Sequence, residues 1–212
     1  MFRIAAAALF TCAALAAQSK LLPVDESPSD PQFSKFYQAF RTTVAKKDAK
    51  LLMSVLDAEV QNSFGGDGGV KEFEEYWNPR DPNSKVWTEL STIMNLGGSF
   101  SIEQGTKTFC APYVYSKFPD NLEALDHGVI IGINVALRTK PSDSAPVISK
   151  LAHDIVKVPS WDPQLNGHWI RVVTRAGAGY VRRSEIRSPG DFRACFGRKA
   201  GVWKLRYLIA GD

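Results

Sequence analysis

The sequence has few of the residues from which most active sites and metal sites are built. It contains three cysteines, three histidines and three methionines in 212 residues, and no close cluster of His, Cys and Asp. It also lacks a zinc signature, a nucleotide-binding fingerprint and a nucleophile elbow. Beyond residues 1–17 no apolar run approaches the roughly 20 residues of a membrane-spanning helix. We therefore expect a non-enzymatic protein without cofactor, metal or transmembrane anchor.

The first 17 residues have the pattern of a secretory signal peptide. One basic residue, Arg3, precedes an Ala-rich apolar run that ends in small residues, so we expect cleavage after Ala16 or Ala17. A buried N-terminal helix is the alternative. Residues 18–31 are rich in Pro, Ser and acidic side chains, which predicts a polar linker. The protein is thus expected to be secreted or periplasmic.

Export leaves two cysteines, Cys110 and Cys195, because Cys12 lies within the signal. An even pair in an oxidising compartment predicts a disulfide, with two free buried thiols as the alternative. On the chain-entropy model, closing a loop of this length stabilises the fold by roughly 4–5 kcal/mol.

The charge is distributed unevenly along the chain. Residues 127–188 hold nine Lys or Arg and four Asp or Glu, whereas the rest of the exported chain is slightly acidic. A basic segment favours an anionic partner, although an ordinary solvated surface has the same composition. No basic run with interleaved aromatic residues occurs, which argues against nucleic acid as a partner.

Residues 32–118 together with 189–212 are predicted to form an α+β domain. Asp30 and Pro31 suit the start of a helix, and apolar residues then recur at helical spacing; Asp48 can cap a second helix. Further helices are expected near 49–56, 70–77 and 86–94, with a tight glycine turn at 65–69. Strands are expected at 106–110, 191–196 and 202–209. The predicted fold is a small antiparallel sheet with helices packed on it.

Residues 119–188 are predicted to form a separate small β-barrel between two strands of that sheet. Short apolar strands alternate here with Pro- and Gly-rich turns. Residues 128–187 resemble bacterial Src-homology-3-like (SH3-like) domains through Val135–Arg138, Ala145–Ile148, Gly167–Val172 and Gly179–Val181. Members of that family are commonly exported and work at the cell wall. The resemblance therefore implies binding of peptidoglycan or another cell-envelope component.

The outer domain more faintly resembles the cone-shaped fold of the ketosteroid-isomerase and nuclear-transport-factor-2 group. The resemblance rests on helices followed by a sheet and on a final strand with a tryptophan, Val202–Leu205. It implies a pocket between helices and sheet. An alternative function is therefore that this domain binds a small molecule or is catalytic, with the barrel as an accessory domain.

Aromatic and arginine residues of the barrel are the candidate ligand contacts. Aromatic rings offer contact area at little entropic cost, and arginine can bind a carboxylate with two parallel hydrogen bonds. Trp169 and Tyr180 could equally be core residues, whereas Trp161 lies in a polar loop and is expected to be exposed. We predict docking of an anionic envelope ligand such as peptidoglycan, with a protein–protein adaptor for an envelope protein as a further alternative. The candidate residues are Trp161, Trp169, Tyr180, Arg138, Arg171 and Arg182.

Overall fold

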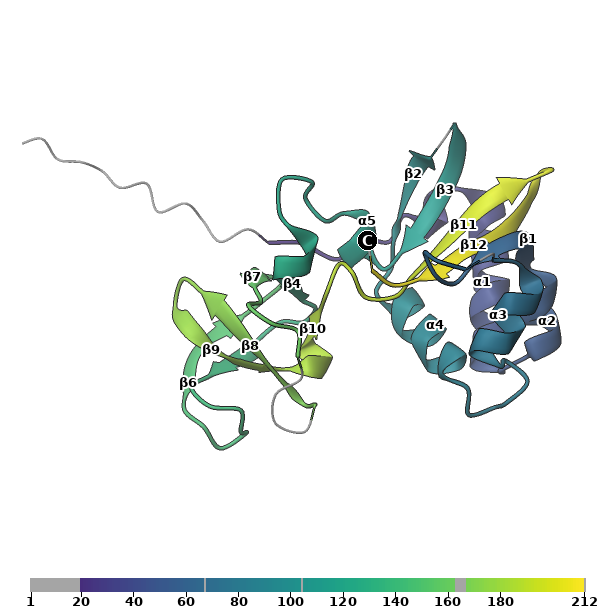
Figure 1. Ribbon diagram of the computed structural model, residues 1–212. Helices are drawn as coiled ribbons and strands as arrows, with labels where there is room; N and C mark the ends of the chain where they lie inside the picture. The colour runs from purple at the N-terminus through teal and green to yellow at the C-terminus, as the bar shows by residue number, and fades with distance from the viewer. Residues whose placement is uncertain (1–19, 67, 104, 163–166, 212) are drawn as a thin grey trace, which may run out of the picture.

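The computed structural model describes residues 20–66, 68–103, 105–162 and 167–211, and it has two lobes, each with its own sheet (Figure 1). The expected signal peptide lies outside the described residues, as do the first two residues of the expected linker. No helix within the described ranges is long and apolar enough to cross a membrane. The two lobes are called the five-stranded domain and the seven-stranded lobe below.

The five-stranded domain is a mixed α and β structure. Its sheet has the order β1-β12-β11-β3-β2, and all pairs are antiparallel except β1 with β12, which is parallel. The apolar pattern predicts β3, β11 and β12 but not β1 and β2, because β1 and β2 each contain only two strongly apolar residues. The strands are β1 (Leu56–Gln61), β2 (Ser99–Glu103), β3 (Thr106–Ala111), β11 (Arg193–Lys199) and β12 (Val202–Ile209).

Helices cover this sheet, and their starts agree with the predicted caps. Asp30 accepts hydrogen bonds from the backbone N–H groups of Gln32 and Phe33, and Asp48 accepts one from Leu51. The helices are α1 (Pro31–Ala45), α2 (Ala49–Ser54), α3 (Val70–Trp77), α4 (Lys85–Asn95) and α5 (Tyr113–Ser116), with short 3₁₀ turns η1 (Ser27–Ser29), η2 (Ala124–Asp126) and η3 (Arg183–Glu185).

Aromatic side chains fill the space between α1 and the sheet. Phe33 is fully buried, and its ring centre lies 4.5 Å from that of Phe109, 4.8 Å from Trp203 and 5.2 Å from Tyr37. Phe196 completes the cluster from β11. The region where the cone-fold resemblance implies a pocket is therefore packed core in the described residues.

The glycine cluster forms the predicted tight turn before α3. Gly68 and Gly69 have φ angles of 73° and 94°, which L side chains rarely adopt. Glu72 holds the turn, because its carboxylate accepts hydrogen bonds from the Gly68 N–H at 2.9 Å and the Asn62 amide at 2.8 Å.

The buried face of β12 differs from the simple alternation that the sequence predicts. Trp203, Leu205 and Ile209 are buried as expected, but Leu208 is buried in place of Tyr207, which is partly exposed. The cause is a β-bulge, since Cys195 pairs with Tyr207 while Phe196 pairs with Leu205. The extra residue shifts the inward face by one position.

The strands of the second sheet all come between β3 and β11 in the sequence. Their order is β10-β4-β7-β8-β9-β5-β6, and within the described residues no pairing joins β6 to β10, so the sheet is not closed into the expected barrel. The strands are β4 (His127–Ile130), β5 (Val135–Arg138), β6 (Val147–Leu151), β7 (Ile155–Lys157), β8 (Trp169–Thr174), β9 (Gly177–Arg182) and β10 (Ile186–Arg187).

The predicted opening strand of this lobe, 131–138, is broken in the structure. Residues 131–134 turn the chain between β4 and β5, with Asn134 at φ 59° and the Ile133 side chain 69% exposed. Apolar residues alternate through the turn as they do in the strand, so the sequence pattern does not predict the turn.

A partly buried ion pair and an apolar cluster join the two lobes. Arg187 of β10 pairs with Glu89 of α4 at 3.1 Å and also donates to the carbonyl oxygen of Phe192. The apolar cluster contains Leu21, Tyr113, Val114, Val129 and Ile155. The contacts therefore come from both lobes and from the N-terminal segment.

Residues 20–30, within the expected linker, lie along both lobes. The Leu21 N–H donates to the backbone carbonyl oxygen of His153 in the seven-stranded lobe at 2.8 Å. Farther along, the Glu26 carboxylate accepts the Phe100 N–H and pairs with Lys117, each at 2.9 Å. The Phe100 hydrogen bond and then the Lys117 ammonium hold the pKa of Glu26 below its ordinary value.

We expect Glu26→Gln to flatten the acid side of the stability profile. A lowered folded-state pKa gives stabilisation that is complete above the unfolded pKa, about 4.3, and is lost as the pH falls through the folded value. The variant should lose about 1 kcal/mol at pH 7 and change less than the wild type between pH 5 and 3, as measured by urea unfolding. Glu75→Gln, in an exposed helix pair with Lys71, is the control. Parallel acid profiles for Glu26→Gln and wild type would contradict the expectation.

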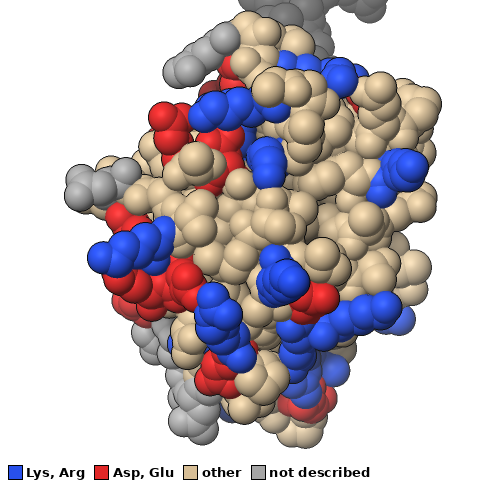
Figure 2. All heavy atoms as spheres, turned by 90° about the vertical axis from the view of Figure 1, so that its right-hand side faces the viewer, with Lys and Arg blue, Asp and Glu red and all other residues tan. Residues whose placement is uncertain are grey.

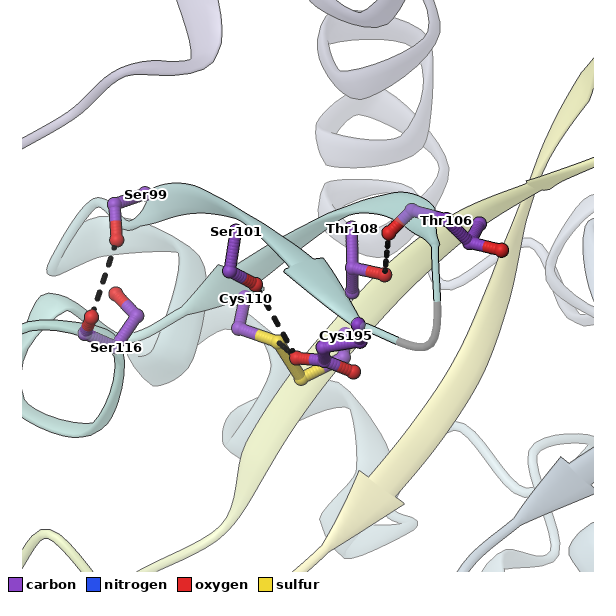
Figure 3. The surroundings of a disulfide bond; sticks show 8 residues. Ser99, Ser101, Thr106, Thr108, Cys110, Ser116 and Cys195 are labelled. Carbon is purple, nitrogen blue, oxygen red and sulfur yellow. Dashed lines mark hydrogen bonds between the residues drawn. A yellow bond between two sulfur atoms is a disulfide. The ribbon is translucent and has the colours of Figure 1, made fainter.

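The predicted disulfide is confirmed. Cys110 of β3 and Cys195 of β11 are direct partners in the antiparallel pair, with a Cα–Cα distance of 4.2 Å and a sequence separation of 85. Figure 3 shows the bond linking the two neighbouring strands. Because the seven-stranded lobe lies between these residues in the chain, the bond fastens the two segments that lead to it.

Candidate functional site

Five of the six candidate ligand contacts belong to one face of the seven-stranded sheet. In β8, Ile170 and Val172 are part of the lobe core, so Arg171 faces the other way, and it is exposed. In β9, Val181 belongs to the same core and Tyr180 alternates with it. Residues opposite each other on paired strands share a face, so strand register decides which side chains meet.

The register places Tyr180 between two arginines. Tyr180 of β9 pairs with Arg171 of β8 on one side and with Arg138 of β5 on the other. Arg138 donates to the Ala145 carbonyl oxygen at 2.8 Å, whereas Arg171 has no hydrogen-bond or ion-pair partner in the described part of the chain. This row of Arg138, Tyr180 and Arg171 is called the Arg–Tyr–Arg row below.

The close approach of β5 to β9 depends on a glycine. A Cβ atom at Gly179 would lie 2.7 Å from the Arg138 carbonyl oxygen and 2.8 Å from the Leu137 side chain. Any side chain there would push β5 away from β9. Gly179 therefore keeps Arg138 beside Tyr180.

Trp169 and Arg182 flank the row as a second cross-strand pair. They are register partners, and the Arg182 guanidinium lies over the Trp169 ring at 5.1 Å from its centre. Asp143 also pairs with Arg182, with the Nε–Oδ1 distance at 3.1 Å. Trp169 is only 7% exposed beneath this arginine. It can support a ligand site but offers little open surface itself.

Trp161 lies apart from the other five. Its indole N–H donates to the Leu125 carbonyl oxygen at 3.0 Å, and a Cβ atom at Gly128 of β4 would lie 2.8 Å from its ring. The ring packs on the lobe core and is half-buried, although its polar surroundings predict full exposure. Trp161 packs against the lobe core, whereas the Arg–Tyr–Arg row lies on the face of the sheet away from that core, so Trp161 does not adjoin the row.

The same face carries two lysines that the sequence analysis did not single out. Lys157 of β7 pairs with Val173, and Lys150 of β6 pairs with Ala136. Both lysines are exposed. Their alternation with the core residues Val156 and Leu151 was the signal that could have found them. They extend the positive charge of the face.

The opposite end of the molecule does not show such a bias. Figure 2 looks onto the five-stranded domain, where basic and acidic side chains are interspersed around an uncharged area. The excess of positive charge thus belongs to the seven-stranded lobe, in agreement with the composition of residues 127–188.

A cleft of about 520 Å³ lies where the two lobes meet, and the one arginine in its lining is already paired. Arg41 donates to the Met94 carbonyl oxygen at 2.9 Å and to the Asn95 side chain at 3.1 Å. The hydroxyl of Tyr113 is buried without a hydrogen-bond partner among the described residues, and burial raises its pKa to about 12. This cleft therefore offers fewer free binding groups than the Arg–Tyr–Arg row.

Comparisons with protein-family models, with curated proteins and with solved structures find no match. The described residues contain no group of three or more His, Cys, Asp or Glu side chains that could hold a metal ion. The geometry and charge of the site are therefore the basis for the function proposed below.

Proposed function

We propose that the protein is an exported, non-enzymatic binding protein whose seven-stranded lobe, an SH3-like domain, docks an anionic cell-envelope component such as peptidoglycan. The observation that carries the proposal is the Arg–Tyr–Arg row, in which one tyrosine lies between two arginines on one sheet face. The signal-like N-terminal sequence supports export, and the order of strand motifs supports the SH3-like assignment.

The chemistry of the row suits carboxylates. A guanidinium group can make two parallel hydrogen bonds to one carboxylate, and Arg171 has its donors free of partners in the described residues. Tyr180 adds a half-buried ring and a hydroxyl between the two cations. A chain with carboxylates spaced along it could contact both arginines at once. Peptide stems of the cell wall and acidic segments of envelope proteins both provide such groups.

We expect Arg171→Ala to weaken binding to insoluble peptidoglycan about tenfold, which corresponds to the loss of one charge-assisted contact. The measurement is the fraction of purified protein that sediments with the polymer over a range of concentrations. Tyr180→Ala should have a similar effect.

Arg175→Ala is the matched control, because Arg175 carries the same charge in the exposed turn between β8 and β9, away from the row. The control should bind as the wild type does. Equal weakening by both arginine variants would mean that only net charge matters and would contradict a defined site. Recovery of wild type in the unbound fraction, together with a stoichiometric co-purified envelope protein, would favour the adaptor function.

A further inference from the structure

We propose that the five-stranded domain carries a second binding site, a cleft at the α3–α4 connection that takes an oligosaccharide. The cleft has a volume of about 480 Å³, within the usual range of small-ligand sites. Its walls combine aromatic rings with polar side chains from the loop and the first residues of α4. Lining residues are Tyr76, Trp77, Asn78, Asp81, Asn83, Ser84, Lys85 and Phe192.

Three aromatic rings form one side of the cleft. The Trp77 ring packs edge-on against Tyr76 and against Phe192, with ring centres 5.0 Å apart in both pairs. Tyr76 is 60% exposed. An exposed ring held by a buried one offers a firm surface for the C–H face of a sugar.

Unpaired polar groups line the other side. No hydrogen-bond partner of the Asn78 or Asn83 side-chain amide, or of the Lys85 ammonium, is found in the described residues. An amide side chain both donates and accepts, as a sugar hydroxyl does, so the two are complementary. The Trp77 indole N–H is also buried without a partner among the described residues, and Trp77 is only 6% exposed. A sugar hydroxyl that reached this N–H would supply the acceptor that buried donors normally have.

The loop that positions these groups is ordered by its own hydrogen bonds. The Asp81 N–H donates to the backbone carbonyl oxygen of Asn78. The carbonyl oxygen of Asp81 in turn accepts the Ser84 N–H and, at 3.2 Å, the Trp87 indole N–H. The Ser84 hydroxyl donates to the Trp77 carbonyl oxygen. The site is therefore preformed, and a ligand need not order the loop.

The test is a titration of the full chain with two soluble probes, the β-linked tetramers of N-acetylglucosamine and of glucose. Tryptophan fluorescence should change with at least one of them, because Trp77 lies in the cleft. Tyr76→Ala should weaken the affinity about tenfold and Asn83→Ala several-fold, whereas Tyr76→Phe, which keeps the ring, should stay within about twofold of wild type.

Ile102→Ala, which truncates an exposed side chain on β2, is the control for the five-stranded domain and should bind as wild type does. Thermal unfolding verifies that every variant is folded. Arg171→Ala should bind the neutral tetramers normally, so failure of the anionic site and failure of this site are distinguishable. No fluorescence change with either tetramer at millimolar concentration, or equal affinity of Tyr76→Ala and Ile102→Ala, would overturn the proposal.

Discussion

Replacement of both bridging cysteines, Cys110→Ala with Cys195→Ala, is expected to lower the free energy of unfolding by about 4–5 kcal/mol. The bond spans 85 residues, so its removal restores a large conformational freedom to the unfolded chain. Alanine is chosen because both positions are 2% exposed, and a serine hydroxyl there would add a buried polar group. Guanidinium unfolding of the variant and of wild type at neutral pH measures the difference.

The size of this effect also reports on the seven-stranded lobe. If that lobe remains folded while the five-stranded domain unfolds, the bond closes a much shorter effective loop, because paired β4 and β10 already hold the ends of the lobe together. The loss is then smaller, and two unfolding transitions are expected. Reduced wild type should match the double variant. A loss below about 1 kcal/mol with a single transition would contradict the entropic account.

Phe33→Ala is expected to destabilise the five-stranded domain by about 3–5 kcal/mol. Phe33 is fully buried, and its ring contacts six others between α1 and the sheet. Removing it leaves a cavity that rigid aromatic neighbours cannot easily fill. The measurement is the denaturant midpoint followed by near-ultraviolet circular dichroism.

Phe36→Ala provides the matched control, since Phe36 belongs to the same helix but is only partly buried. Its loss should be clearly smaller. Equal losses for the two variants would show that the aromatic cluster does not depend on Phe33 at its centre.

Local signals in the sequence predicted much of the five-stranded domain. Asp30 and Asp48 marked helix starts correctly because capping depends on neighbouring residues only. Strand β1 was missed because it has only two strongly apolar residues, and its parallel pairing with the distant β12 leaves no local signal. The bulge that buries Leu208 in place of Tyr207 likewise depends on the register between two strands. Alternation within one strand does not predict it.

The candidate site shows the same division between local and long-range information. The sequence marked Arg171 and Tyr180 as candidate ligand contacts but left Tyr180 equally open as a core residue, and only pairing across β5, β9 and β8 brings them together beside Arg138. Trp161 was expected in the solvent because its neighbours in sequence are polar. Its actual neighbours, Gly128 and Leu125, are more than 30 residues away, and no local pattern indicates them.

The chain leaves the five-stranded sheet and returns to it at adjacent positions, since Ala111 at the end of β3 pairs with Ala194 near the start of β11. A gene segment encoding the intervening residues could therefore be lost, gained or exchanged while the remaining strands keep their alignment, with a short turn in its place. Glu89 of α4 and Leu21 of the N-terminal segment would then lose the partners that the intervening residues provide, Arg187 and the apolar side chains of Val129 and Ile155. These contacts make the two lobes dependent on each other during evolution, even though their backbones are separable.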